Sequence, residues 1–181
     1  MKVKSQYDIY VGEYPFHKQL YDEMVPILET YPDKHGRDTN VKATVTEWNF
    51  GLGGEYLQLN TLKKCIINVA SNGHFKFSFN TPSFKALWGN IYHKGDYTQS
   101  HDHLYNQLSF VYFLKSKWYH SPLVLTYSGK KIQPKEGRLV VFPPMWMFPH
   151  SGNSPISNTK YIMSSYLRYD KVLMEDSDGE N

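Results

Sequence analysis

The sequence contains one cysteine, Cys65, among its 181 residues, which excludes an intramolecular disulfide and fits a reducing compartment. No apolar stretch approaches the roughly 20 residues that cross a bilayer, and the first residues lack the apolar segment of a signal peptide. Lysine and arginine form no long run, and the net charge is only +3, so a nucleic-acid-binding patch is not indicated. We therefore expect a cytoplasmic protein with no membrane and no nucleic-acid partner.

Internal repeats and low-complexity segments are also absent from the chain. Its one glycine cluster, residues 51–54, lacks the lysine and the serine or threonine of a phosphate-binding loop. The composition is that of a globular protein, with 40% hydrophobic and 20% charged residues. Aromatic residues make up 16% of the chain, and 15 of them are tyrosines, which favours strands over a helical bundle.

The first 80 residues show mixed periodicity. Residues 6–12 alternate as in a short strand, and apolar positions at helical spacing predict a helix from Pro15 to about Thr30. Pro26 is expected to kink or shorten that helix. Residues 41–50 fit a strand or an extended segment, and a second amphipathic helix is predicted from about Leu57 to near Ser71-Asn72-Gly73.

After Pro82 the pattern changes to short runs rich in aromatic and β-branched residues, separated by turn residues. Eight strands after two helices predict a mainly β (α+β) fold, namely a double-stranded β-helix or cupin-like jelly roll with the helices packed on its outer face. The predicted strands lie near 85–93, 97–103, 107–115, 122–127, 131–133, 137–142, 146–150 and 159–169.

We expect residues 1–174 to form one domain, in which 1–82 support a core barrel over 83–170. The remaining residues, 175–181, are acidic and fit a flexible tail. The oligomeric state does not follow from the sequence.

The spacing of three histidines and one lysine along the chain indicates a candidate functional site. If 97–103 is a strand, His101 and His103 share one face and Asp102 points to the other. Imidazole suits iron, copper, nickel and zinc, so this pair predicts part of a metal site. His150 ends a later predicted strand and could complete a three-ligand site with open coordination positions. Lys160 begins the last strand, where its ammonium group would suit a carboxylate.

The order of these residues resembles the 2-oxoglutarate- and Fe(II)-dependent oxygenases, particularly their prolyl-hydroxylase-like and short phage or bacterial branches. The family motif is H-x-D/E, a second histidine some fifty residues on, and Arg or Lys about ten further. The similarity covers roughly residues 86–169. Its motifs in this chain are His101-Asp102-His103, His150, Lys160, Trp88-Gly89-Asn90-Ile91-Tyr92, Gly95-Asp96-Tyr97, residues 108–114 and residues 134–143.

The resemblance implies that His101 and His150 bind Fe(II) and that 2-oxoglutarate is the cosubstrate. Lys160 would pair with the distal carboxylate of the cosubstrate, and Tyr92 and Asn90 would complete its pocket. The implied reaction is a dioxygenase reaction, in which O2 is used to hydroxylate a protein side chain or a small metabolite. Iron and cosubstrate would supply the oxidising chemistry, while the protein holds an open site in a dry pocket.

The chain departs from the family motif at one position, because His103 stands where the family has a carboxylate. Regular alternation favours a three-histidine site of His101, His103 and His150. A β-bulge at 101–103 would instead turn Asp102 onto the metal. Three neutral ligands remove one negative charge from the metal, which bears on both the metal bound and the cosubstrate.

Two other functions fit the same residues. Gly95 followed by His101-x-His103 also matches the first cupin motif, which would give a three-histidine dioxygenase without 2-oxoglutarate. That motif expects Glu where Gln107 or Leu108 stands. A non-catalytic jelly-roll binding module with incidental histidines is the third possibility.

Overall fold

The computed structural model describes residues 9–35, 38–71, 82–103, 106, 108–143, 150–152 and 159–169. Two helices and eleven strands lie within these ranges. The elements are β1 (Tyr10–Glu13), α1 (His17–Glu29), β2 (Val41–Lys42), β3 (Thr44–Val45), α2 (Leu57–Ser71), β4 (Pro82–Tyr92), β5 (Tyr97–His101), β6 (Leu108–Lys115), β7 (Leu123–Leu125), β8 (Lys130–Ile132), β9 (Arg138–Phe142), β10 (His150–Gly152) and β11 (Lys160–Tyr169).

The strands form two sheets. One has the order β1-β9-β6-β11-β4-β3 and the other the order β2-β5-β10-β7-β8. All strand pairs are antiparallel. This architecture is the predicted double-stranded β-helix, and the eight strands β4 to β11 follow the two helices as expected.

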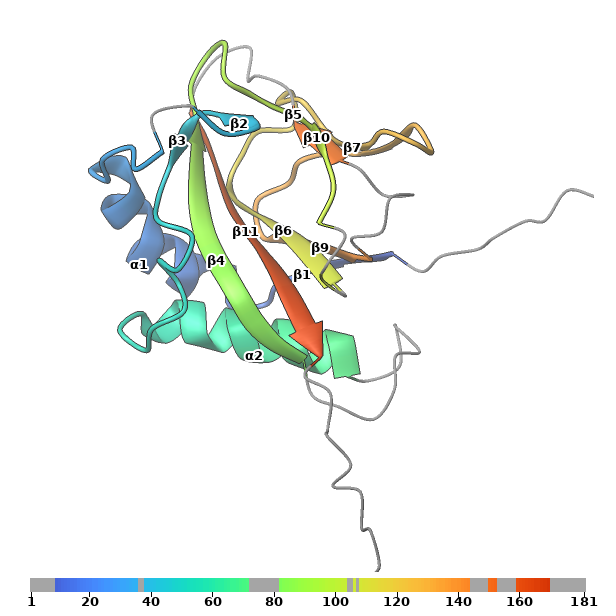
Figure 1. The fold of residues 1–181 in the computed structure, drawn as a ribbon. Helices are drawn as coiled ribbons and strands as arrows, with labels where there is room; N and C mark the ends of the chain where they lie inside the picture. The colour runs from blue at the N-terminus through green and yellow to red at the C-terminus, as the bar shows by residue number, and fades with distance from the viewer. Residues whose placement is uncertain are drawn as a thin grey trace, which may run out of the picture.

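Both helices cover the outer face of the six-stranded sheet, on the side away from β5, β7 and β10 (Figure 1). Each helix presents an apolar stripe to that sheet, which is what a 3.6-residue period predicts. The stripe of α1 is Leu20, Met24, Val25 and Leu28, and that of α2 is Leu59, Leu62, Ile66 and Ala70.

Helix α1 is not shortened at Pro26, as the sequence had suggested it could be, but continues to Glu29. Pro26 lies on the exposed side of the helix, so water can reach the carbonyl that loses its partner there. The Pro26 carbonyl itself accepts a hydrogen bond from the Thr30 hydroxyl at 3.4 Å.

Alternation along the long central strands separates two cores. In β11, Tyr161, Met163 and Leu167 belong to the core under the helices, whereas Ile162 belongs to the core between the sheets. Lys160 pairs with Tyr92 and Ile162 with Asn90 across β11 and β4. Residues that share the Ile162 face of β11 and the Asn90 face of β4 therefore point between the sheets, where a ligand cavity can form.

Several predicted boundaries change. The predicted strand 97–103 ends at His101, and 41–50 contains the two short strands β2 and β3 before a turn. Of the predicted strand 146–150, residues 146–149 lie outside the described residues, and His150 begins β10. Residues 6–8 and the acidic segment 175–181 also lie outside them. Neither helix of the described part is long and apolar enough to span a membrane.

Candidate functional site

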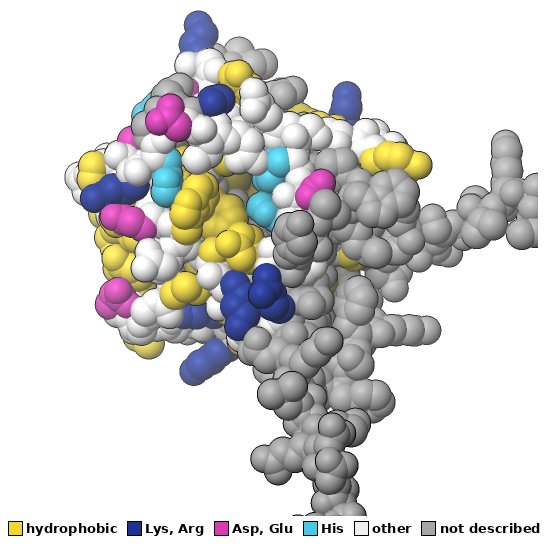
Figure 2. Space-filling view, viewed as in Figure 1, with side chains coloured by type: hydrophobic (Ala, Val, Ile, Leu, Met, Phe, Trp, Pro, Cys, Tyr) yellow, Lys and Arg dark blue, Asp and Glu magenta, His cyan; other side chains and the backbone are white. Residues whose placement is uncertain are grey.

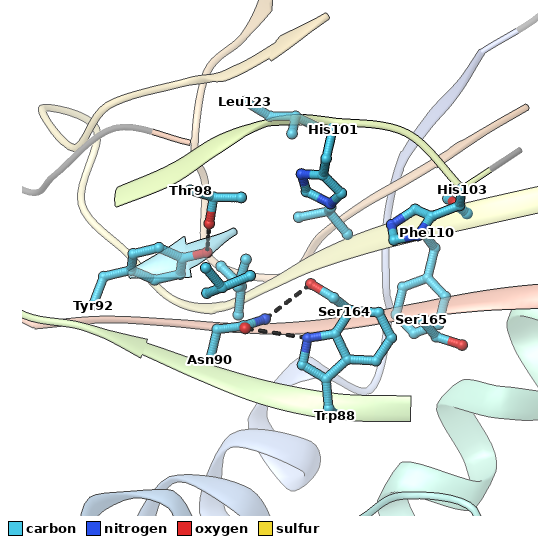
Figure 3. Close-up of a pocket in the computed structure, with 14 residues that line it drawn as sticks. Trp88, Asn90, Tyr92, Thr98, His101, His103, Phe110, Leu123, Ser164 and Ser165 are labelled. Atoms are coloured by element: carbon cyan, nitrogen blue, oxygen red, sulfur yellow. Dashed lines mark hydrogen bonds between the residues drawn. The ribbon is translucent and has the colours of Figure 1, made fainter. Parts of the chain in front are cut away.

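A cavity with about 430 Å³ of empty space opens between the two sheets. Figure 3 shows His101 and His103 above it and Trp88, Asn90 and Ser164 opposite them. Its lining residues come from six strands and the segment after β5, and are Val41, Trp88, Asn90, Tyr92, Thr98, His101, His103, Ser109, Phe110, Val111, Leu123, Ile162, Ser164 and Ser165.

His101 is the last residue of β5 and lines this cavity. Its Nδ1 lies 2.9 Å from the carbonyl oxygen of Gln99. A carbonyl can only accept, so Nδ1 carries the proton and donates, and Nε2 is the unprotonated nitrogen of the neutral ring. Burial also lowers the pKa of His101, so the ring is neutral at pH 7.

The predicted strand 97–103 ends at His101, and His103 lies two residues beyond that end. Its ring nevertheless lies beside that of His101, with the ring centres 4.9 Å apart. Burial, with a smaller effect from His101, lowers the pKa of His103 to about 4. Both imidazoles are therefore neutral at physiological pH, which is the state that binds a metal.

The separation of the two rings fits binding to one ion. Two imidazoles that bind a metal through nitrogens at about 2.1 Å, at a right angle to each other, place their ring centres roughly 4.6 Å apart. The observed 4.9 Å is close to this value. The Nδ1 hydrogen bond of His101 to a carbonyl is also typical of metal-binding histidines.

The structure places His150 by its backbone. It is the first residue of β10 and the direct antiparallel partner of His101 in β5. Two histidines some fifty residues apart in the chain are thus neighbours in one sheet. Among the side chains that the structure describes, no three His, Cys, Asp or Glu groups gather as a metal site.

Lys160 is buried between the sheets, with only 3% of its surface exposed. Its Nζ lies 4.7 Å from the centre of the Tyr92 ring. Burial lowers the pKa of Lys160 to about 8, so the amine is still mainly protonated at pH 7. A small cavity beside it shares four lining residues with the main cavity, Tyr92, Val111, Leu123 and Ile162. The ammonium group thus adjoins the inner end of the site.

Two polar groups expected from the sequence have described partners. The Tyr92 hydroxyl lies 2.6 Å from the Thr98 hydroxyl, which ties β4 to β5. Asn90 accepts a hydrogen bond from the Trp88 indole at 3.1 Å and donates one to the Ser164 hydroxyl at the same distance. Tyr92 is therefore placed near Lys160, whereas Asn90 forms part of the opposite wall (Figure 3).

Sequence analysis missed the serine and threonine hydroxyls of the cavity, at Thr98, Ser109, Ser164 and Ser165. Ser109 is 1% exposed, and its buried hydroxyl has no hydrogen-bond partner in the described part of the chain. An orphaned buried hydroxyl is expensive unless a ligand or water satisfies it. The available signal was a polar residue within an otherwise apolar strand, as in Leu108-Ser109-Phe110.

A second cleft, with about 560 Å³ of empty space, lies on the outer side of the two histidines. It shares His101, His103, Val41 and Trp88 with the inner cavity. The two histidines therefore line both the inner cavity and the outer cleft. The cleft is lined by Asn40, Val41, Trp48, Trp88, His101, Asp102, His103 and Tyr166.

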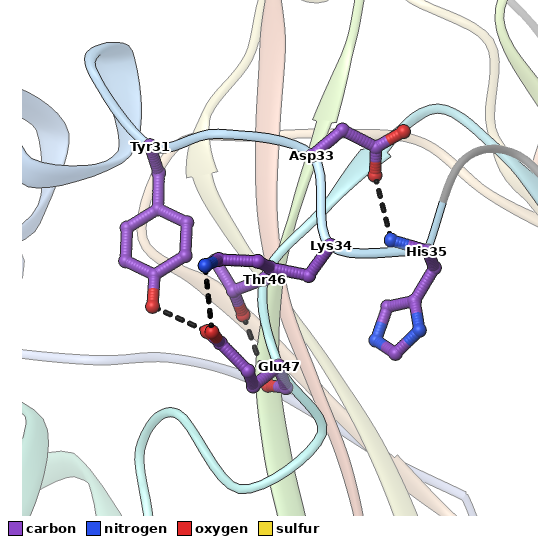
Figure 4. Close-up of polar contacts among 6 residues, drawn as sticks. All are labelled: Tyr31, Asp33, Lys34, His35, Thr46 and Glu47. Carbon is purple, nitrogen blue, oxygen red and sulfur yellow. Dashed lines mark hydrogen bonds and ion pairs between the residues drawn. The ribbon is translucent and has the colours of Figure 1, made fainter.

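A polar cluster fixes one wall of the outer cleft (Figure 4). Glu47 accepts a hydrogen bond from the Tyr31 hydroxyl and forms an ion pair with Lys34 at 3.2 Å. These contacts tie the segment after α1 to the chain beside β3. His35, in that segment, stacks on Trp48 with the ring centres 4.2 Å apart. These polar and stacking contacts thus hold Trp48 in the wall of the outer cleft.

The fold and the site geometry together define a double-stranded β-helix with paired histidines at the cavity mouth and a buried lysine beside its inner end. No protein-family model and no curated protein sequence matches the chain, but solved structures do. The viral collagen prolyl hydroxylase of Paramecium bursaria Chlorella virus-1, in complex with 2-oxoglutarate, is 16% identical with a TM-score of 0.65. The match covers 91% of this chain and 97% of that one.

Two further prolyl hydroxylases show the same similarity. A prolyl-4-hydroxylase from Pseudomonas putida is 16% identical with a TM-score of 0.68, over 91% of this chain and 94% of its own. A prolyl hydroxylase from Trichoplax adhaerens, in complex with a peptide of a hypoxia-inducible factor, is 13% identical with a TM-score of 0.70, over 91% and 84%. At these identities the comparison establishes the shared fold.

Proposed function

We propose that this protein is a non-haem Fe(II)- and 2-oxoglutarate-dependent dioxygenase that hydroxylates a protein side chain or a small molecule. One observation carries the proposal. A single cavity has two neutral imidazoles at its mouth and a buried ammonium group beside its inner end. A ligand with a metal-chelating end and a distal carboxylate matches both ends. Several solved structures of this fold are prolyl hydroxylases, one of them a 2-oxoglutarate complex, which is consistent with this assignment.

The metal ligands in this proposal are His101, His103 and His150. The ring separation of the first two supports their binding to one ion. Residues paired directly across an antiparallel ladder share a face of the sheet, and His150 pairs with His101. We assign His103 rather than Asp102 as the third ligand because its ring already lies beside that of His101.

Lys160 and Tyr92 would hold the distal carboxylate of 2-oxoglutarate. The Lys160 ammonium group provides the charge, and the Tyr92 ring fixes its position by a cation–π contact. The orphaned Ser109 hydroxyl is available to a cosubstrate oxygen. Asn90 would act through the hydrogen bonds that hold Trp88 and Ser164 in the wall. Bound iron and 2-oxoglutarate would supply the oxidising chemistry for hydroxylation with O2, with release of succinate and CO2.

Calorimetric titration of the Mn(II)-loaded protein with 2-oxoglutarate tests the cosubstrate site. We expect Lys160→Ala to weaken binding by about 30-fold or more, because a buried charge-assisted contact is worth about 2 kcal/mol. Lys115→Ala is a matched control, since Lys115 also lies over a tyrosine ring, that of Tyr161, but pairs with Glu29 of α1 on the helix side. Equal losses in both variants would contradict the assignment.

Uncoupled succinate formation tests the metal site. His150→Ala is expected to abolish it in the presence of Fe(II), while the exposed His93→Ala leaves it within about twofold. Metal binding without 2-oxoglutarate binding would instead indicate a three-histidine cupin-type dioxygenase. Failure to bind either would indicate a non-catalytic binding module.

A further inference from the structure

Two basic residues that the proposed chemistry does not use, Lys85 and Arg168, lie on β4 and β11 near a residue of the outer cleft. Tyr166 of β11 lines the cleft. Leu167 points the other way, into the core under the helices. Arg168 therefore shares the face of Tyr166 by strand alternation, and its side chain is exposed.

Lys85 reaches the same place through a bulge in β4. Tyr166 pairs with Ala86 and Leu167 with Phe84, so Lys85 is the extra residue between them. In such a bulge two residues oppose one, so that Lys85 and Ala86 both face Tyr166. Lys85 is exposed as well. Figure 2 shows a group of lysine and arginine side chains next to the hydrophobic surface beside the histidines.

The distance from His103 past Tyr166 to Arg168 suits an extended ligand. The ring of His103 lies 5.4 Å from that of Tyr166, and Arg168 lies two residues, or roughly 7 Å, further along the strand. An extended polypeptide covers this distance with about three or four residues, at roughly 3.3 Å each. The two cations are therefore within reach of a peptide whose reacting side chain sits at the histidines.

We propose that the substrate is a polypeptide segment with an acidic side chain about three residues from the residue that is hydroxylated. This inference rests on the proposed function and specifies its substrate class. The aromatic wall of Trp48, Trp88 and Tyr166 packs the segment, and Lys85 with Arg168 binds its carboxylate. Asp102 lines the cleft on the histidine side. Its carboxylate disfavours a chain with a negative charge at every unit, such as a nucleic acid, but not a peptide with one localised acid.

Selection from a phage-displayed library of random dodecapeptides on the protein loaded with Mn(II) and 2-oxoglutarate tests the inference. The wild type is expected to enrich Asp and Glu about threefold over the input, and the selected peptides to lose about tenfold in affinity for the variant Lys85→Glu/Arg168→Glu. The control Lys130→Glu/Lys131→Glu changes the net charge equally at two exposed residues of β8 and is expected to stay within twofold. A second variant, Lys85→Gln/Arg168→Gln, is expected to give an intermediate loss.

Selected peptides without acidic enrichment, or equal losses in the two charge-reversed variants, would overturn the inference. So would a fluorescein-labelled dT12 oligonucleotide that binds the wild type more tightly than the selected peptides. The affinity of every variant for 2-oxoglutarate is measured in parallel and is expected to be unchanged. A protein that binds 2-oxoglutarate but shows no acidic preference refutes only the substrate class, whereas one that binds no 2-oxoglutarate refutes the proposed function itself.

Discussion

The protonation state of Lys160 determines how well the proposed site can bind a carboxylate. Its pKa is lowered to about 8 by burial, yet binding a dianion requires the protonated form. We therefore expect the affinity for 2-oxoglutarate to be constant below about pH 8 and to fall about tenfold per pH unit above it, because binding must then take up a proton. Calorimetry from pH 6.5 to 9.5, in buffers of different ionisation enthalpy, measures both the affinity and the proton uptake. A flat profile up to pH 9.5 would show that Lys160 does not bind the ligand.

The buried charge of Lys160 should also lower the free energy of unfolding of the ligand-free protein. The pKa of Lys160 falls from 10.5 to about 8 on folding, so between these values the unfolded chain binds more protons, and stability rises with pH across that window. Below pH 8 the folded state bears the full penalty of about 3 kcal/mol. Lys160→Met is expected to stabilise the free protein at pH 7 by about 2 kcal/mol, less than the full penalty because the contact with Tyr92 is lost. Urea denaturation measures this, and a destabilised variant would contradict the argument.

At the scale of elements, the two helices are joined by a side-chain cap. Glu23 of α1 accepts hydrogen bonds from the backbone N–H groups of Gln58, at 3.1 and 3.0 Å to its two oxygens, and of Leu59 at 3.1 Å, in the first turn of α2. A carboxylate there satisfies otherwise unpaired donors and complements the helix dipole. We expect Glu23→Ala to lower the free energy of unfolding by about 1–2 kcal/mol without changing the affinity for 2-oxoglutarate, because the helices lie on the far side of the sheet. Loss of that affinity in a folded variant would show that the helices shape the cavity.

The elements also show where sequence reasoning succeeds and where it stops. Apolar periodicity located both helices and the eight strands after them, because burial of one face sets that pattern. It placed His101 and His103 in one strand, but β5 ends at His101. The two rings still lie side by side, with their centres 4.9 Å apart. The bulge in β4 at Lys85 could not be predicted from the sequence either, since it depends on the register of β4 against β11.

The whole molecule brings its site together from two sheets. The six-stranded sheet supplies Lys160 and Tyr92, whereas the five-stranded sheet supplies His101 and the backbone position of His150. The hydrogen bond between the Tyr92 and Thr98 hydroxyls is one described contact that crosses between them. A metal and a dicarboxylate bound together would therefore link the two layers, in addition to filling the cavity.

That linkage predicts a cooperative stabilisation. Ligands that bind only the folded state at a hundred times their Kd stabilise it by about 2.7 kcal/mol, which raises the Tm of a domain of this size by about 5–10 °C. We expect Mn(II) and 2-oxoglutarate together to reach this range in a thermal melt, with 2-oxoglutarate alone giving little, because one end of it would lack its partner. Addition of EDTA should return the Tm to its starting value. In His101→Ala the shift should disappear for both ligands, and its persistence there would place the metal somewhere other than between the two sheets.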